Sequence, residues 1–436
     1  MPPVTHDEPP ETLLRSLSVV GLWLLVINGM IGAGIFGLPA EAARLTGAWS
    51  PLVFLLCGLL IAPVMLTFSE LSSYFGGTGG PILYARTAFG EFIGFQTGWA
   101  FYVARATALA ANLNLLLSSA AFFLGGIDQG SERIAGLFVL CALLTAINVI
   151  GTRHAIGSVG VLTLLKLLPL GALVVLGAPQ LVAYAPSLDH AAAPQAASLG
   201  AAMLLLVYAF VGFESALVPA GEARNPARDM PRALLWSLVA VTLLYMAIQG
   251  VCVVLLPDLA NTQRPVVDAA AVLFGPIGTL LMTAGVVVSV GGNVAAAMLS
   301  TPRMTYALAR SGQLPAVFAT VHPTFKTPSV SIMIFGAVVF VLAISGSFVW
   351  LAAMSVMIRL LIYLTCIAAA PRLRRRYADA PNALRLPGGY VIPAIAAVLC
   401  AGLLVQVSWV SVMASTALLG VGTVLFLIAG RRNSES

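Results

Sequence analysis

Apolar runs long enough to cross a lipid bilayer fill most of this chain, and they limit it to very few kinds of fold. Of its 436 residues, 60% are hydrophobic and only 9% are charged, whereas a soluble globular domain is roughly a quarter charged. A soluble protein of this length could not bury so much apolar surface behind so little charge. In lipid, only helices and closed barrels satisfy their backbone hydrogen bonds, and runs of about 20 apolar residues predict helices.

The chain is therefore predicted to be an all-α integral membrane protein with about twelve transmembrane helices. The predicted helices cover residues 17–38, 51–74, 92–124, 134–151, 156–178, 198–220, 231–256, 269–299, 329–345 and 348–370, and the run 391–430 holds two more, divided near Val407 to Val412. Residues 1–16 form an N-terminal tail, 17–370 the transport core, 371–390 a basic loop and 431–436 a C-terminal tail.

Twelve helices place both termini on one side, and the basic residues indicate which side that is. If it is the cytoplasm, sixteen of the 22 Arg and Lys residues are cytoplasmic, three are external and three lie within helices. Basic loops stay in the cytoplasm, so this distribution supports both the helix count and the orientation. The cluster from Arg372 to Arg376 is interpreted as a cytoplasmic flank rather than a nucleic-acid site. We expect a multi-pass protein of the plasma (inner) membrane with both termini cytoplasmic.

The sequence lacks the features that are typical of several other classes of protein. The four histidines lie in tails or loops, which disfavours an enzyme site inside the membrane. The five cysteines lie singly in apolar segments, which indicates buried thiols rather than disulfides or a metal site. We find no P-loop for ATP-driven transport and no signal peptide before the first helix, and we expect no cofactor.

Two predicted helices carry matching interruptions. Residues 28–39 read NGMIGAGIFGLP and residues 208–219 read YAFVGFESALVP, and in each a glycine precedes a proline by seven residues. Glycine weakens a helix and proline removes a backbone donor, although glycine in a membrane helix can also serve close packing. The two helices begin five-helix units of opposite orientation, 17–178 and 198–370. Paired breaks in inverted repeats are typical of the binding sites of secondary transporters.

An unwound helix in mid-membrane exposes N–H groups at one end and carbonyl groups at the other. In lipid these groups are costly unless a ligand, water or a neighbouring helix bonds them. The N–H end favours an anion such as a carboxylate, and the carbonyl end favours an ammonium group. The two breaks therefore predict a zwitterionic ligand and leave its side chain open.

Several segments of the sequence resemble the amino acid–polyamine–organocation (APC) superfamily of permeases. They are residues 32–39, 68–74 with 79–84, 210–215 with 222–226, and 302–315, within a similarity that covers about residues 15–376. The resemblance implies a five-plus-five inverted repeat (a LeuT-like fold) with broken helices 1 and 6. It also implies amino acid transport.

The resemblance further implies which residues bind the amino acid. Amides at positions 33–35 would bind the substrate carboxylate, carbonyls at 30, 208 and 211 would accept from its amino group, and the ring at 208 would act as a gate. The implied substrate-binding residues are Met30, Ala33, Gly34, Ile35, Leu109, Asn112, Tyr208, Val211, Glu214 and Asn293.

Arg105, Lys166, Glu214 and Arg359 lie in predicted helices and each needs a reason to be there, because a charge at the centre of the bilayer costs at least about 2.5–3.5 kcal/mol. Lys166 is the candidate for coupling, because the resemblance places it where sodium-coupled relatives bind a cation between helices 1 and 8. It could replace that sodium or act as a proton switch. Glu214 is a candidate proton carrier, substrate contact or acceptor for freed amides. Arg105 is expected to pair with an acid such as Glu214 or to line a water-filled route, and Arg359 to be a packed, paired structural cation.

These features predict a secondary active amino acid transporter rather than an enzyme, with an amino acid as its substrate and no nucleic acid as a partner. The lack of further acidic residues in the expected pocket favours neutral L-amino acids, while Glu214 favours cationic amino acids or polyamines as the alternative. Proton symport and amino acid exchange both remain open, as do a monomer and a homodimer. A non-transporting sensor usually needs an appended signalling domain, and a channel would not need paired breaks.

Overall fold

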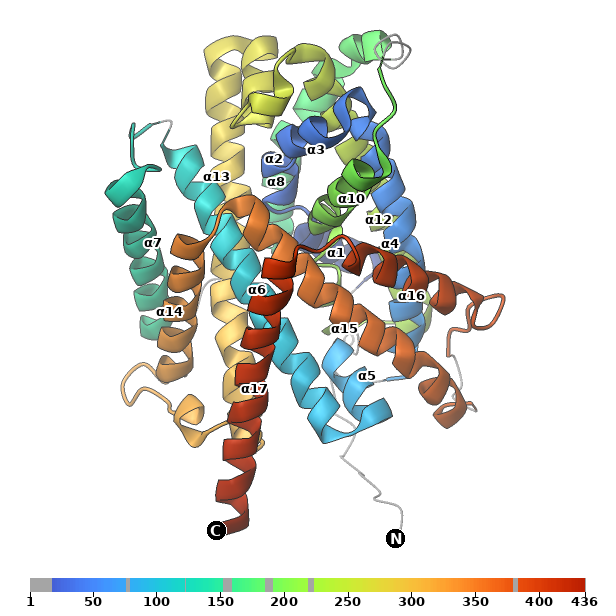
Figure 1. Ribbon diagram of the computed structural model, residues 1–436, viewed down its shortest axis with the longest axis vertical. Coiled ribbons are helices and arrows are strands. Elements are labelled where there is room, and N and C mark those ends of the chain that lie inside the picture. Colours follow the sequence, from blue (N-terminus) through green and yellow to red (C-terminus); the bar gives the residue numbers. More distant parts are fainter. Residues whose placement is uncertain are drawn as a thin grey trace.

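The structure is a computed structural model, and it describes residues 18–75, 79–121, 123–151, 159–184, 191–218, 223–378 and 383–435. Helices account for most of these residues (Figure 1). In chain order they are α1 (Val19–Met30), α2 (Gly34–Gly37), α3 (Pro39–Thr46), η1 (Gly47–Trp49), α4 (Ser50–Ser73), α5 (Gly80–Phe89), α6 (Glu91–Ala120), α7 (Gly130–Ile150), α8 (Val159–Gly177), η2 (Ala178–Ala183), α10 (Ala196–Phe210), α11 (Glu214–Leu217), α12 (Pro226–Leu255), η4 (Leu259–Asn261), α13 (Pro265–Arg310), η5 (Ala316–Ala319), α14 (Ser329–Ser345), α15 (Phe348–Arg376), α16 (Val391–Leu404) and α17 (Trp409–Glu435).

Caps and glycines set where several of these helices begin and end. Ser18 accepts a hydrogen bond from the amide of Gly21 at the start of α1, and Ser347 does the same for Trp350 in α15. Gly90, with φ of 92°, separates α5 from α6 in a conformation that favours glycine. Gly275, with φ of 63°, divides a short first segment of α13 from its long remainder.

Among the described residues, nine helical stretches are long and apolar enough to cross a membrane. The shorter apolar helices α10, α14 and α16 add to them. A multi-span, helical membrane protein is therefore confirmed, whereas the count of twelve and the inverted repeat stay predictions. α10 is short because the chain leaves the helical conformation at Val211.

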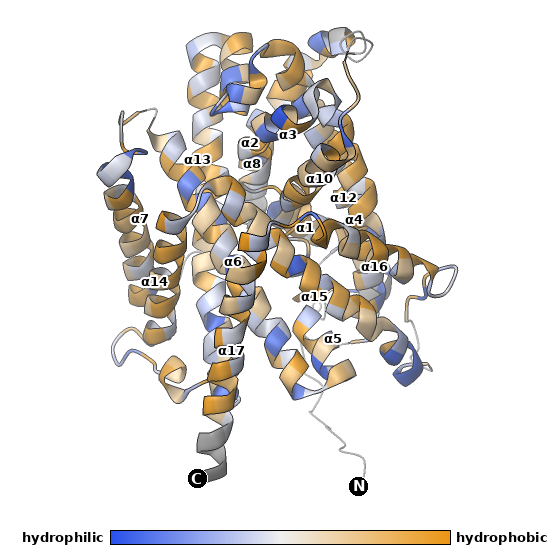
Figure 2. Cartoon of the chain, viewed as in Figure 1, coloured by the Kyte–Doolittle hydropathy of each residue, from blue (hydrophilic) through white to orange (hydrophobic). Residues whose placement is uncertain are grey.

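The sides of the molecule present apolar surface. Large hydrophobic side chains such as Leu168, Val175 and Trp236 are exposed, and Figure 2 shows hydrophobic residues along α7 and α14. Such extended apolar surface on a single chain marks an interaction with membrane or partner. Together with the span-length helices, it indicates a surface that faces lipid.

The helices with breaks lie inside the bundle. α1 and α4 pack along α12, α10 packs against α4 and α15, and α6 packs against α13 and α15, while α7 and α14 pair at one edge (Figure 1). The residues at both breaks are buried or nearly so. The fold therefore surrounds the two interrupted segments with other helices.

Candidate functional site

The first break leaves backbone donors without partners inside the protein. α1 ends at Met30 and α2 begins at Gly34, so residues 31–33 are not helical. Within the described part of the chain, the amides of residues 32–35 donate no hydrogen bond, although all four residues are buried. Buried amides without acceptors are rare and costly. Four in succession form a donor group suited to a carboxylate.

The second break requires a glycine. α10 ends at Phe210 and α11 begins at Glu214. Gly212 has φ of 109°, a backbone conformation that residues other than glycine rarely adopt. Its amide donates to Oε2 of Glu214 at 2.8 Å, so this carboxylate satisfies one freed donor.

The two breaks touch each other directly. A Cβ atom added to Gly29 would lie 2.6 Å from the carbonyl oxygen of Gly212, and one added to Gly212 would lie 2.2 Å from that of Gly29. The hydroxyl of Tyr245, on α12, donates to the carbonyls of Met30 and Ala209, both at 3.2 Å. The free ends of both helices therefore form one site.

Several of the implied substrate-binding residues lie beside the breaks. A Cβ added to Gly32 would lie 2.5 Å from Nδ2 of Asn293, so this α13 side chain faces the first break. The hydroxyl of Tyr208 donates to Oδ1 of Asn112 at 2.8 Å, which joins α10 to α6. Leu109 is buried one turn before Asn112 on α6, and no recorded bond joins it to either break.

The carbonyls expected to receive the amino group differ in their bonding. The carbonyl of Met30 already accepts from Tyr245, although a carbonyl oxygen can accept two hydrogen bonds. Among the described residues, no hydrogen bond reaches the carbonyls of Tyr208 and Val211. Gly34, one of the donors, lies against Ala209 between these two acceptors, since a Cβ added to Gly34 would lie 2.7 Å from Cα of Ala209.

Lys166 joins α8 to the first break. Its Nζ donates to the carbonyl oxygen of Ile31 at 2.9 Å and to that of Asn28 at 3.2 Å, and the residue is 2% exposed. These are carbonyls that the end of α1 frees. The ammonium thus lies where a small cation could bind, but its recorded bonds reach α1 and not α13.

Glu214 forms an ion pair with Arg359 of α15, and not with Arg105. The carboxylate is fully buried and also accepts from the hydroxyl of Tyr363 at 3.3 Å. Arg105 instead donates from Nη2 to Ser215 at 2.6 Å and from Nη1 to Ser300 at 2.9 Å. The structure therefore contradicts the expectation that Arg105 pairs with Glu214.

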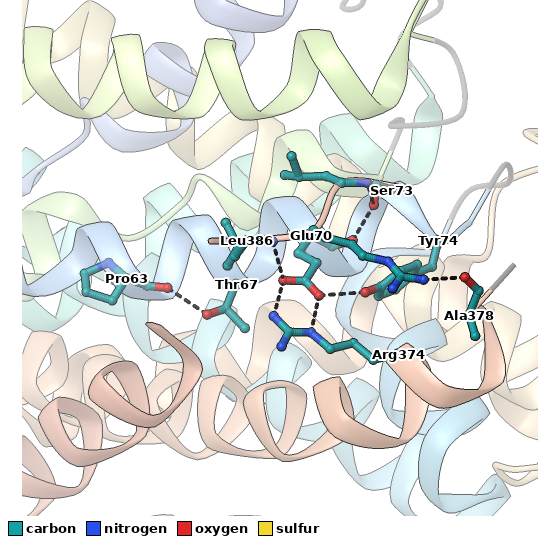
Figure 3. A network of polar contacts seen from close by, with 10 residues as sticks. Pro63, Thr67, Glu70, Ser73, Tyr74, Arg374, Ala378 and Leu386 are labelled. Atoms are coloured by element: carbon teal, nitrogen blue, oxygen red, sulfur yellow. Dashed lines mark hydrogen bonds and ion pairs between the residues drawn. The ribbon is translucent and has the colours of Figure 1, made fainter. Parts of the chain in front are cut away.

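The structure has a second buried ion pair, between Glu70 and Arg374, that the sequence analysis did not predict. Glu70, which is 1% exposed, binds Arg374 of α15 with two hydrogen bonds, and it also accepts from Tyr74 at 2.6 Å (Figure 3). The amide of Leu386 lies 3.4 Å from the same carboxylate. The position of Glu70 inside a predicted helix was the available signal, because a buried acid requires a partner.

A cavity of about 670 Å³ opens at the α3 end of the molecule. Its wall comes from α2, α3, α6, α7, η4 and residues 344–349, and includes Asn114, Arg133 and Phe348. The ring of Phe348 meets that of Tyr208 edge-on, with centroids 5.9 Å apart. These two rings therefore lie between the cavity and the crossed breaks.

Comparison with known proteins identifies the family of this chain. A family model described as "Amino acid permease" matches residues 17–428. The serine/threonine exchanger SteT of Bacillus subtilis (strain 168) is 29% identical over 390 residues, which cover 86% of this chain and 87% of that protein. The branched-chain amino acid permease BcaP of the same organism is 25% identical over 447 residues, covering 98% and 95%. A putative arginine/ornithine antiporter of Escherichia coli (strain K12) is 29% identical over 326 residues, covering 70% of each.

These relatives are transporters and not enzymes, and the family model spans nearly the whole chain. The motifs around both breaks fall within the matched residues. This chain belongs to the amino acid permease family.

Proposed function

We propose that this chain is a secondary active transporter that binds the amino and carboxyl groups of an amino acid at the crossed breaks. The observation that supports it best is the run of four buried amides, residues 32–35, without acceptors in the described structure. They would bind the carboxylate, and the carbonyls of Tyr208 and Val211 would accept from the ammonium group. Both ends of the substrate backbone are then recognised, whatever its side chain.

The surroundings of the site support alternating access. The cavity leads toward the site and the rings of Phe348 and Tyr208 close it, so a movement of those rings would admit the substrate from that side. With both termini in the cytoplasm of a plasma-membrane protein, the cavity would face outward. The three relatives are named for amino acids with different side chains: serine or threonine, branched-chain amino acids, and arginine or ornithine. This variety agrees with a site that binds the backbone groups that all amino acids share.

The proposal is tested with substrate analogues rather than with protein variants, because backbone donors cannot be mutated. Proteoliposomes that contain the purified protein are loaded with an L-amino acid that the protein exchanges. Three analogues of that amino acid are then tested for how well they compete with its uptake. The decarboxylated amine, the methyl ester and the N-acetyl derivative should each compete at least about tenfold more weakly, since each loses a charge-assisted bond. Equal competition by the amine would contradict the carboxylate site.

We further propose that Lys166 takes the place of a coupling cation. Its two bonds to carbonyls of the first break support this role, because loss of its proton would weaken both bonds and release the break. Uptake measured against pH should therefore change shape in Lys166→Ala. Wild-type activity with an unchanged pH profile would refute this role, and net uptake without internal substrate would separate proton symport from exchange.

The alternative of a cationic amino acid or polyamine depended on Glu214. That carboxylate pairs with Arg359 and accepts from two further donors. Its charge is thus already balanced, which removes the feature that favoured a cationic side chain.

A further inference from the structure

The charges around the crossed breaks do not balance. Four charged side chains of the described chain contact the breaks or a residue bound to them. Lys166, Arg105 and Arg359 are positive, and Glu214 is negative, which leaves two positive charges in excess. Excess charge inside a membrane protein is costly, and such residues mark the pathway of a substrate or ion.

Arg105 has the largest unused capacity for binding an anion. A guanidinium carries five N–H donors, and in the described structure Arg105 uses two of them, both on neutral serine hydroxyls. Arg359, by contrast, forms an ion pair with the carboxylate of Glu214. Both guanidinium groups lie against the ring of Phe101, with Cζ 5.4 Å from its centroid for Arg105 and 5.9 Å for Arg359. Their mutual repulsion makes an additional anion more favourable there.

Arg105 is also placed to reach a bound substrate. It lies on α6 four residues before Leu109 and seven before Asn112, which puts all three on one face of that helix. Asn112 contacts Tyr208 just before the second break, and Ser215, bound to Arg105, lies just after it. The guanidinium is therefore beside the site, on the side away from the cavity wall at Phe348. Arg105 is half-buried, and its partner Ser300 is exposed at the surface of the described chain.

We propose that the substrate is an amino acid with a carboxylate side chain, and that Arg105 binds that second carboxylate with the hydroxyls of Ser215 and Ser300. The assignment rests on the proposed function, because the backbone groups of the substrate must occupy the breaks. A substrate with net charge −1 reduces the excess positive charge, a neutral one leaves it unchanged, and a cationic one increases it. The charge balance therefore favours an acidic side chain over the neutral one that the sequence suggested.

The test compares amino acids of nearly equal shape that differ in one charge. Uptake into proteoliposomes is measured for L-glutamate against L-glutamine and for L-aspartate against L-asparagine. The acid should exceed its amide by at least about 30-fold, the lower bound for losing one partner of a buried charge pair. Arg105→Gln should bring both ratios close to one, while Arg105→Lys should retain a preference for the acid. Arg310→Gln, which alters an exposed arginine at the end of α13, should leave both ratios at the wild-type value.

The outcomes separate this inference from the proposed function. Transport of glutamine or another neutral amino acid at or above the rate of glutamate, in the unmodified protein, would overturn the inference and leave the amino acid site intact. Failure of every amino acid to exchange would instead overturn the proposed function. The wild-type comparison decides the substrate class even if Arg105→Gln does not fold. An unchanged acid preference in a folded Arg105→Gln would refute the role of this residue.

Discussion

Replacement of Gly212 by alanine should destabilise the protein through two separate effects. The backbone at this residue has φ of 109°, and holding a non-glycine residue in a left-handed conformation costs about 1–2 kcal/mol. The new Cβ would also lie 2.2 Å from the carbonyl oxygen of Gly29, which is backbone and cannot rotate away. Overpacking of this kind costs about 1–3 kcal/mol. We therefore expect a loss of about 2–5 kcal/mol.

Gly29→Ala separates the two effects. The added Cβ meets the same crossing from the other side, 2.6 Å from the oxygen of Gly212, but its backbone conformation is not left-handed. The overpacking cost of about 1–3 kcal/mol should remain, offset by up to about 1 kcal/mol because alanine favours the helix α1. The double variant should cost less than the sum of the single variants, because one backbone shift relieves both clashes.

The assay is thermal unfolding of the purified protein in detergent, with and without the exchanged amino acid. The unfolding temperature should fall in the order wild type, Gly29→Ala, Gly212→Ala, and binding of the amino acid should stabilise the variants less. Gly420→Ala is the matched control, since this glycine lies within α17 with open space around it, and alanine there should gain up to about 1 kcal/mol. An unfolding temperature for Gly212→Ala equal to that of the wild type would refute the crossing of the breaks.

Three further predictions follow from other contacts. Tyr245→Phe should lower the unfolding temperature, because it removes the one hydroxyl proton that two buried carbonyls share, at a cost of about 1–3 kcal/mol; no change would contradict those bonds. Glu70→Leu alone should cost about 3–5 kcal/mol, and the double variant with Arg374→Met should recover most of it, as buried pairs do when both partners are replaced. Ser118→Cys should react with a membrane-impermeant thiol reagent on intact cells, while the five buried native cysteines do not; protection of Ser118→Cys would contradict an outward-facing cavity.

The sequence identified features that depend on one segment of chain at a time. The breaks near Gly32 and Gly212 followed from glycine and proline spacing, and the cost of a charge in lipid singled out Lys166 and Glu214. Apolar run length likewise indicated the helical membrane fold. Each of these features depends on local chemistry, and none depends on how the helices are rotated against one another.

Partners between helices could not be predicted in the same way. Arg105 and Arg359 were both able to pair with Glu214, and the choice depends on how α6 and α15 are rotated against α11. Glu70 has its partner 304 residues away, and Tyr245 resembles any aromatic residue of an apolar run until its two carbonyls are known. Side-chain pairing across helices is a property of packing, which one sequence without relatives does not specify.

The bonds around the breaks fall into two groups, and this division limits how the site can open. Gly29, Gly212 and Tyr245 join the two breaks to each other, whereas Lys166 and Arg359 join them to α8 and α15. The proposed carboxylate donors lie on one break and the ammonium acceptors largely on the other, so a bound amino acid requires the first group to stay intact. A movement that changes access while substrate is bound must therefore rearrange the second group. Variants of Lys166 or Arg359 should then alter transport rates more than substrate affinity, and variants at the glycine crossing should alter affinity first.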